Sequence, residues 1–221
     1  MVDWRAMKAH VISALVLGCA LPLAAQTPAP ATTPPANSSD LGFTYNLPGG
    51  WEILNMAPMV PAAKQQEEQQ ASSDAEKKGA SCSQIYLTAR HGSPASVIVV
   101  VTLPWDCFGQ AFTSKDLPSF GEGAAGGLVQ NFNVATPVYG AYALGSHDLW
   151  IERVQGSAKD DPQSQYTIEL ACTILKKAAV CWMTLASDST ALASFENSTV
   201  SLEGETATAL VPASAFQTPS Q

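Results

Sequence analysis

The sequence has few charges and few histidines, and it lacks the common catalytic motifs. Charged residues make up 14% of its 221 residues, and only three histidines are present. There is no G-x-S-x-G, no H-E-x-x-H and no nucleophile beside an evident base. The formal net charge of −8 would repel phosphate backbones and anionic lipid head groups. The composition therefore predicts a protein that is not an enzyme, holds no cofactor or metal and does not bind nucleic acid.

Long apolar runs are also absent beyond the N-terminus. A membrane span would need about 20 consecutive apolar residues. The N-terminus has the order of a signal peptide, with a short basic region, an apolar run over 9–17 and small residues after it. We expect residues 1–25 to be removed, so that the mature protein begins at Gln26. The alternative is lipidation at Cys19, within Val-Leu-Gly-Cys, which would make the protein a membrane-anchored envelope lipoprotein.

C-x-x-C spacing is missing as well, which disfavours a zinc ribbon or a thioredoxin-like redox site. Apart from Cys19 the chain keeps four cysteines, and an even number in an exported protein indicates two disulfides with three possible pairings. The four are Cys82, Cys107, Cys172 and Cys181.

One pairing is favoured by the segment 166–187, which has the pattern of two strands joined by a tight turn. If Cys172 lies opposite Cys181, the apolar residues of both strands share one face. A two-residue loop at 176–177 would make the cysteines a non-hydrogen-bonded pair with Cα atoms about 4.5 Å apart, which a disulfide can span. Lysines are poor residues for such a loop, so a longer loop is the alternative. The opposite face is mixed, and we expect it to be only partly covered.

The remaining pair, Cys82 and Cys107, follows by elimination and by a similar hairpin argument with Tyr86 opposite Leu103. Strands are predicted at 84–90 and 97–103 on either side of a turn. The run VIVVV in the second strand is apolar at every position, which is typical of a central strand covered on both faces.

Proline content and charge suggest where the folded part begins and ends. Residues 26–39 contain four prolines and are predicted to be an extended linker. A single domain is predicted over 40–205, followed by a frayed tail over 206–221. Within the domain, the polar segment 64–78 is either a solvated helix or a disordered insertion.

Two helices and a further pair of strands complete the expected order. A glycine-rich helix is predicted over 116–132 and a short helix over 190–195. Strands are predicted over 137–143 and 149–154. Runs of strands interrupted by few helices predict an α+β fold with a mainly antiparallel sheet.

The segment GFTYNLPGGWEIL, which begins at Gly42, resembles the opening G-F-x-x-x-x-P-x-x-W hairpin of Mog1/PsbP-like proteins. The later strands, the glycine-rich helix, the long hairpin and the closing ALASFENSTVSLE follow in the same order, over roughly residues 40 to 203. This resemblance implies an antiparallel sheet flanked by helices, arranged as a sandwich, and an accessory or binding role. It carries over no functional residue.

Two local patterns could carry chemistry, but each has a simpler interpretation. The glycines of 121–126 spell G-x-G-x-x-G, yet a dinucleotide site needs them where a strand enters a helix, and here they fall inside the predicted helix. On a strand, Asp148, Trp150 and Glu152 would share one face, which offers too few carboxylates for a hard cation. We interpret that strand as half-buried with a polar solvent face, and His147 as lying on the other face.

The other candidate positions are single residues near turns and strand ends. His91 follows a strand and precedes a probable turn, and Asp160-Asp161 lies in a proline-bounded loop. Trp105, at the end of a strand, is the aromatic residue that we expect to face a partner or a pocket. Together these patterns predict an exported binding or accessory protein, periplasmic or extracellular, whose protein or small-molecule partner the sequence does not specify.

Overall fold

The computed structural model describes residues 36–38, 40–56, 60–61, 65, 74–109, 111–119, 132–212 and 214–216. The predicted signal peptide, Cys19, most of the linker and the glycines of 121–126 lie outside the described residues.

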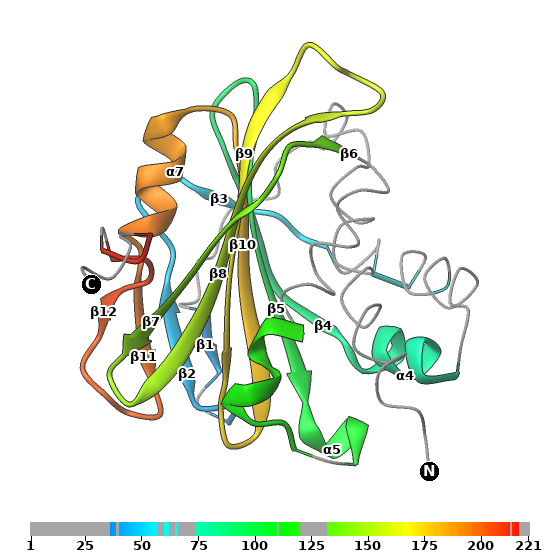
Figure 1. Ribbon diagram of the computed structural model, residues 1–221, viewed down its shortest axis with the longest axis vertical. Helices are drawn as coiled ribbons and strands as arrows, with labels where there is room; N and C mark the ends of the chain where they lie inside the picture. Colours follow the sequence, from blue (N-terminus) through cyan, green and yellow to red (C-terminus); the bar gives the residue numbers. More distant parts are fainter. Residues whose placement is uncertain are drawn as a thin grey trace.

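Most of the described chain forms two antiparallel sheets (Figure 1). The strands of the larger sheet are β3 (Glu52–Ile53), β4 (Gln84–His91), β5 (Ser96–Pro104), β6 (Phe132–Val134), β7 (Val138–Leu144), β8 (His147–Ala158), β9 (Gln165–Ile174) and β10 (Ala178–Ala186). Their order is β3-β4-β5-β10-β9-β8-β6, and β7 also pairs with β8. The α+β prediction with a mainly antiparallel sheet is confirmed, although the protein is mostly β.

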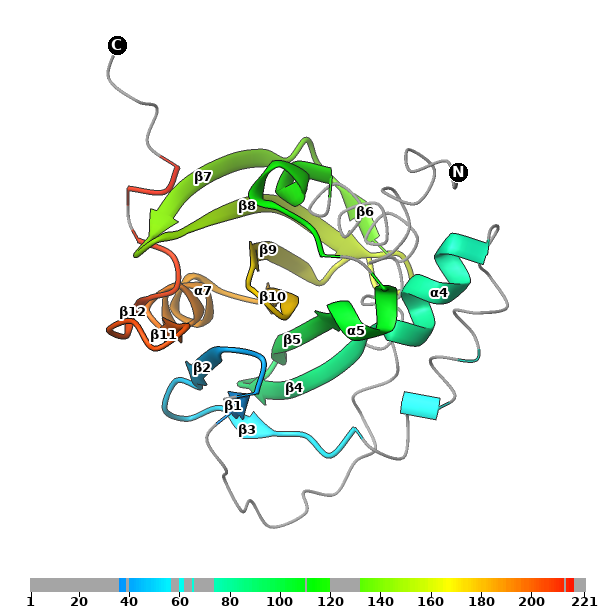
Figure 2. The same cartoon turned by 90° about the horizontal axis from the view of Figure 1, so that it is seen from below.

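A smaller sheet and a few short helices complete the described structure. The small sheet has the order β1-β2-β11-β12 and consists of β1 (Ala36–Ser38), β2 (Phe43–Asn46), β11 (Thr199–Leu202) and β12 (Thr208–Ala209). The helices are α4 (Asp74–Cys82), α5 (Trp105–Phe108) and α7 (Ser189–Glu196), with a 3₁₀ turn at Ser114–Asp116. In Figure 2 the large sheet is seen nearly edge-on, with α7 and the small sheet on one side and α4 and α5 on the other.

This arrangement buries the centre of the large sheet on both sides. Every residue of β10 is buried, and so is nearly every residue of β5, as the VIVVV run predicts. On β9 and β10, the mixed face was expected to be partly exposed, which is wrong: Glu169, Trp182 and Thr184 are all fully buried. The reason is that α7 and the small sheet cover that face. The strands of the small sheet form a separate sheet and do not pair with β9 or β10.

The hairpin of β9 and β10 has the predicted register. Cys172 lies opposite Cys181, and their disulfide joins Cα atoms 4.2 Å apart. Leu175 N–H donates to the Ala178 carbonyl at 2.8 Å, as expected for the pair that flanks a two-residue loop. The local apolar alternation and the turn therefore suffice to set this pairing.

Replacing Cys172 and Cys181 together with alanine should lower the free energy of unfolding by about 2–3 kcal/mol, because the closed loop is short. Denaturant unfolding of the parent and the double variant under non-reducing conditions measures the difference. As a comparison, the double alanine variant of Cys82 and Cys107 opens a loop of 25 residues and should cost about 3–4 kcal/mol. Equal stability of the parent and the first variant would contradict the prediction.

The second predicted disulfide is present, but the hairpin argument for it is wrong. Cys82 and Cys107 are bonded with Cα atoms 5.5 Å apart, and each lies on a short helix, α4 or α5. Tyr86 falls at a register shift between β4 and β5, while Leu103 pairs with Ala179 of β10. α4 ends just before β4 begins, and α5 begins directly after β5 ends, so the two cysteines meet beyond the ends of the strands.

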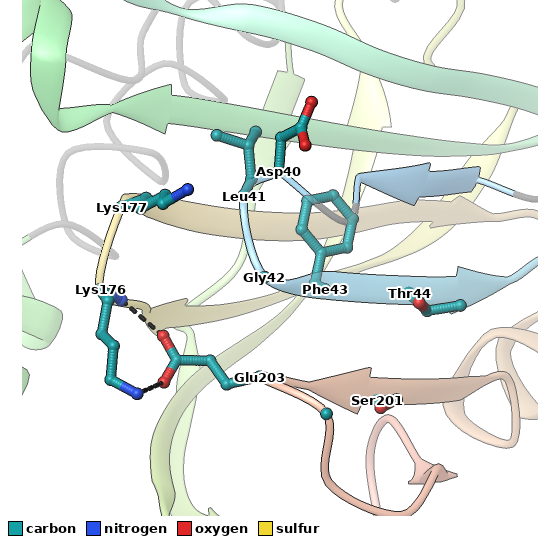
Figure 3. A pocket seen from close by; sticks show the side chains of 10 residues that line it. Asp40, Leu41, Gly42, Phe43, Thr44, Lys176, Lys177, Ser201 and Glu203 are labelled. Carbon is teal, nitrogen blue, oxygen red and sulfur yellow. Dashed lines mark hydrogen bonds and ion pairs between the residues drawn. The ribbon is translucent and has the colours of Figure 1, made fainter.

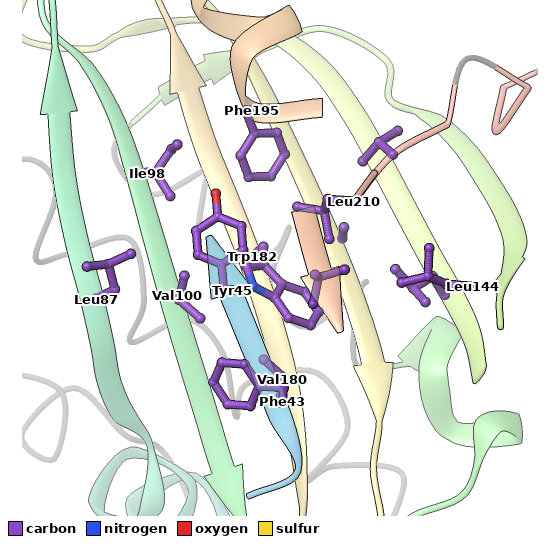
Figure 4. Close-up of a cluster of buried hydrophobic side chains, with 14 of the residues drawn as sticks. Phe43, Tyr45, Leu87, Ile98, Val100, Leu144, Val180, Trp182, Phe195 and Leu210 are labelled. Carbon is purple, nitrogen blue, oxygen red and sulfur yellow. The ribbon is translucent and has the colours of Figure 1, made fainter. Parts of the chain in front are cut away.

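The opening segment is also arranged differently from the expected hairpin. β2 pairs with β1 and β11, whereas β3 pairs with β4 in the other sheet. The turn between them, in which Gly50 has a φ of 84°, therefore carries the chain from one sheet to the other. This crossing allows Phe43 and Tyr45 to reach Trp182 of the large sheet, with ring centroids 5.9 and 6.3 Å from it. Figure 4 shows this cluster with Phe195 of α7.

The predicted domain boundaries need correction at both ends. β1 lies within the predicted linker, where it pairs with β2. The predicted tail contains β12, and Leu210, Val211 and Ala215 are buried in the core cluster between the sheets. These apolar residues follow a long polar turn, and only the packed sheet provides the surface that buries them.

The predicted helices are partly described. The short helix is confirmed as α7, and the Asp188 side chain caps it by accepting from Ala191 N–H at 2.8 Å. Part of the polar segment is helical in α4. Of the helix expected over 116–132, only 116–119 and 132 are described, and the remainder lies outside the described residues.

Candidate functional site

A cavity of about 440 Å³ opens where the start of β2, the β9–β10 turn and the end of β11 meet (Figure 3). Its walls come from three parts of the chain that are far apart in sequence. They are Asp40, Leu41, Gly42, Phe43, Thr44, Lys176, Lys177, Ser201, Glu203 and Gly204.

Two left-handed turns bring these walls together. Gly42 has a φ of 90°, and its carbonyl accepts from Glu203 N–H at 2.6 Å. Glu203 itself has a φ of 48° and is followed by Gly204 with a φ of 85°. A side chain at Gly42 would be strained by its backbone angle and would contact Glu203 Cγ at 3.4 Å. The glycine therefore allows β2 and the β11 turn to approach each other.

One ion pair lies among the residues that line the cavity. Lys176 contacts both oxygens of Glu203, through its backbone N–H at 2.8 Å and its Nζ at 2.8 Å. Burial opposes ionisation of Glu203, but the hydrogen bonds from Lys176 outweigh it and keep the pKa of Glu203 below its usual range. The hydrogen bond to Glu203 likewise raises the pKa of Lys176. Both side chains are therefore charged at neutral pH and largely satisfy each other.

Two further charged side chains line the same cavity but are not joined in an ion pair like that of Lys176 and Glu203. Lys177 and Asp40 are exposed, and within the described part of the chain neither takes part in an ion pair. Figure 3 shows their side chains on either side of Leu41. The cavity thus offers a cation, a carboxylate and an apolar side chain between them.

A second polar cluster lies nearby, at the β7–β8 turn. Glu205 accepts from the backbone N–H and the hydroxyl of Ser146, and these bonds keep the pKa of Glu205 below its usual range. His147 Nε2 lies 3.9 Å from a Glu205 oxygen. The order of contacts is not that of a catalytic triad, because the serine is bound to the carboxylate rather than to the imidazole. Ser146 is therefore not activated as a nucleophile.

The strand that carries His147 also holds a partly buried charged network, in which only Glu169 is fully buried. Arg153 Nε donates to Glu169 at 2.6 Å, and its other nitrogen donates to Glu196 of α7. Phe216 covers the guanidinium with its ring centroid 4.1 Å away. Burial raises the pKa of Glu169 to about 7; Arg153 opposes this rise, and the neighbouring Glu196 contributes to it.

The burial of charged residues on both faces of β8 corrects the prediction of a half-buried strand with a polar solvent face. Glu152, on the face that was expected to be solvated, is buried. Arg153 is held between β9 and α7 and is not among the residues that line the cavity. A sequence pattern cannot show that two carboxylates from other elements meet this arginine.

None of the other sequence candidates lines the cavity, although Trp105 is hydrogen-bonded to the β9–β10 turn beside it. Trp105 is buried rather than facing a pocket, because its Nε1 donates to the Leu175 carbonyl at 3.0 Å and its ring packs on Phe112. His91 packs against Trp51 with ring centroids 5.5 Å apart. Asp160-Asp161 lies in an exposed loop, where Asp161 accepts from Ser164 Oγ.

Sequence reasoning missed the cavity residues themselves. The sequence pattern indicates only a turn at Lys176 and gives no role to Glu203, although the two residues are bonded across 27 positions. The glycine at 42 and the Glu203-Gly204 pair were the available signals, since such residues favour left-handed turns.

Within the described ranges, no group of three or more histidine, cysteine, aspartate or glutamate side chains is placed to hold a metal ion. No helix in the same part of the chain is long and apolar enough to cross a membrane. Comparison with protein-family models and with curated proteins finds no match to this chain.

Proposed function

We propose that this protein is an exported, non-catalytic binding or accessory protein, and that the cavity beside the β9–β10 turn is its binding site. The observation that carries the proposal is the arrangement of Lys177 and Asp40, two opposite charges that line one cavity and are not paired with each other. A catalytic alternative has less support, since Ser146 is held by a carboxylate and the cavity lining includes no histidine or cysteine.

The lining favours a small ligand that carries both charges around an apolar body. Lys177 would bind a carboxylate and Asp40 an ammonium group, while Leu41 contacts the apolar part. Free amino acids with apolar side chains and short peptides have this chemistry. The Lys176–Glu203 pair would hold the turn in place rather than bind, because its charges already satisfy each other.

Titration calorimetry with apolar amino acids and with di- and tripeptides tests this proposal. We expect Lys177→Gln and Asp40→Asn each to weaken binding at least about tenfold, because each leaves one ligand charge without its partner. Lys115→Gln, which removes an exposed lysine outside the cavity lining, is the matched control and should bind like the parent. Absence of any binding heat in the panel, or equal loss in the control, would contradict the proposal.

Export is supported by the two disulfides, which indicate that the chain matures in an oxidising compartment.

The Mog1/PsbP-like family is the finer assignment that we propose for the fold. It is supported by the element order, in which early strands precede a long antiparallel hairpin, a short helix and a closing strand. The opening hairpin is the part of the resemblance that the two-sheet arrangement of β2 and β3 does not support.

A further inference from the structure

The turn that follows β11 holds two hairpin turns of the large sheet through two carboxylates. Glu203 accepts from Lys176 in the β9–β10 turn, through the backbone N–H and Nζ, each at 2.8 Å (Figure 3). Glu205, two positions later, accepts from the backbone N–H of Ser146 in the β7–β8 turn at 3.2 Å, and also from the Ser146 hydroxyl. This turn therefore connects both hairpin turns to the small sheet.

Hydrogen bonds within the turn tie its two carboxylates to each other. Glu205 N–H donates to the Leu202 carbonyl at 2.9 Å, and Ser201 Oγ donates to the Glu205 carbonyl. Between these contacts Glu203 and Gly204 both have a positive φ, 48° and 85°, a backbone conformation that glutamate adopts rarely. So short a closed turn cannot absorb a displacement of Glu205, and Glu203 should move with it.

The β9–β10 turn does not depend on Glu203 in the same way, because α5 holds it from another side. Trp105 donates from its backbone N–H to the Lys177 carbonyl at 2.9 Å and from its Nε1 to the Leu175 carbonyl at 3.0 Å. A loss of the carboxylate contacts should therefore move the turn after β11 rather than the β9–β10 turn. Glu203 and Gly204 belong to the cavity lining, so this movement would shift one wall of the cavity.

We infer that Glu205 is a positioning residue for the cavity, and that its contact with the β7–β8 turn sets the place of the wall formed by Glu203 and Gly204. Glu205 and Ser146 are not among the residues that line the cavity. Glu205 therefore acts through Glu203, which it presents to Lys176. The consequence for ligand binding rests on the function proposed above, whereas the coupling between the two carboxylates does not.

A glycine in the β7–β8 turn provides a way to disturb this contact without removing a charge. Gly145 has a φ of 62°, and a Cβ at this position would lie 1.6 Å from Glu205 Oε2. That oxygen is the end of a flexible side chain, so Gly145→Ala should displace the Glu205 carboxylate and keep its charge. Glu205→Ala, in contrast, removes both the contact and the charge.

The pKa of the Glu203 carboxyl shows whether the wall is in place. Burial opposes ionisation of Glu203, but the hydrogen bonds from Lys176 outweigh it, and His147 adds to the lowering of this pKa. Because the two carboxylates repel each other, loss of the Glu205 charge alone would lower the pKa of Glu203 further. Loss of the contact with Lys176 would instead raise this pKa toward its usual value. Charge and position thus have effects of opposite sign.

An NMR titration of the Glu203 carboxyl carbon in the parent and both variants tests the inference. We expect the pKa of Glu203 to rise in Glu205→Ala and in Gly145→Ala. Asp160→Asn removes a carboxylate from an exposed loop and is the control, in which this pKa should equal that of the parent. A pKa that falls or stays unchanged in either folded variant overturns the inference. Thermal unfolding shows that each variant is folded, and Glu205→Ala decides alone if Gly145→Ala does not fold.

Calorimetry with a ligand from the amino acid and peptide panel measures the consequence for binding. Both variants should weaken binding at least about fivefold, which is the lower end of typical coupling between sites. Gly145→Ala should do so with every charge still present. Affinities equal to that of the parent would overturn the positioning role. If the parent binds nothing in the panel, the proposed function fails by itself, and the NMR titration still decides the coupling.

Discussion

Replacing Arg153 with methionine should lower the free energy of unfolding by about 3–5 kcal/mol at pH 8, and by much less at pH 5. The Glu169 side chain is fully buried, and Arg153 is the cation that contacts it at 2.6 Å. Without this cation, the folded protein at pH 8 must either bury an uncompensated carboxylate or protonate it against the solution pH. At pH 5 protonation is easy, so the penalty is small.

The same carboxyl should give the parent protein a characteristic pH dependence. The pKa of Glu169 is about 7 in the folded state and 4.5 in the unfolded state, so the folded state holds this proton more tightly. The resulting stability is fully present below the unfolded pKa and is lost as pH rises through the folded pKa. Over that window the contribution falls by about 3 kcal/mol, at about 1.4 kcal/mol per pH unit.

Denaturant unfolding at pH 5, 6 and 8 measures both effects, with Glu169→Gln as the informative second variant. It should abolish this part of the pH dependence, because glutamine keeps the shape but does not titrate. Glu52→Gln is the control: Glu52 pairs with Arg90 with 34% of its side chain exposed, and its loss should cost less than about 1 kcal/mol. An Arg153→Met penalty that is the same at pH 5 and pH 8 would show that lost packing, not charge, is responsible.

Replacing Trp182 with alanine should lower the free energy of unfolding by about 3–5 kcal/mol, which is the usual cost of removing a large aromatic side chain from a core. Trp182 is fully buried at the centre of the cluster between the sheets, and Phe43 meets it edge-on with ring centroids 5.9 Å apart. The cavity left behind would be bounded by two sheets whose strands are fixed by their own hydrogen bonds, so little collapse can fill it.

Trp182→Phe separates packing from hydrogen bonding. In the described structure the Trp182 Nε1 is buried and has no hydrogen-bond partner, so phenylalanine removes no bond and should cost clearly less than alanine. Thr206→Ala, at an exposed position, should change stability by no more than about 0.5 kcal/mol. Denaturant unfolding of the three variants gives the order of their stabilities. A Trp182→Phe variant as unstable as Trp182→Ala would contradict the packing explanation.

The sequence by itself determined the features that depend on neighbours a few residues apart. The alternation on β9 and β10, together with the two-residue turn, set Cys172 opposite Cys181, because a shift of one residue would move one strand's apolar set to the wrong face. Asp188 capped α7 for a similarly local reason, and the uninterrupted apolar run of β5 predicted its burial on both faces.

Only the tertiary structure decided which distant segments meet. Glu203 reaches Lys176 across 27 positions and Glu205 reaches Ser146 across 59, and neither contact leaves a periodic trace in the sequence. The separation of β2 and β3 into different sheets also leaves no local trace in the sequence, because the turn at 48–50 suits either a hairpin or a crossing between layers. Local pattern decides which face of an element is apolar, but the surface that covers this face is supplied by chain elements from elsewhere. The cavity beside the β9–β10 turn is built from three such elements, and it exists only once the two sheets have packed.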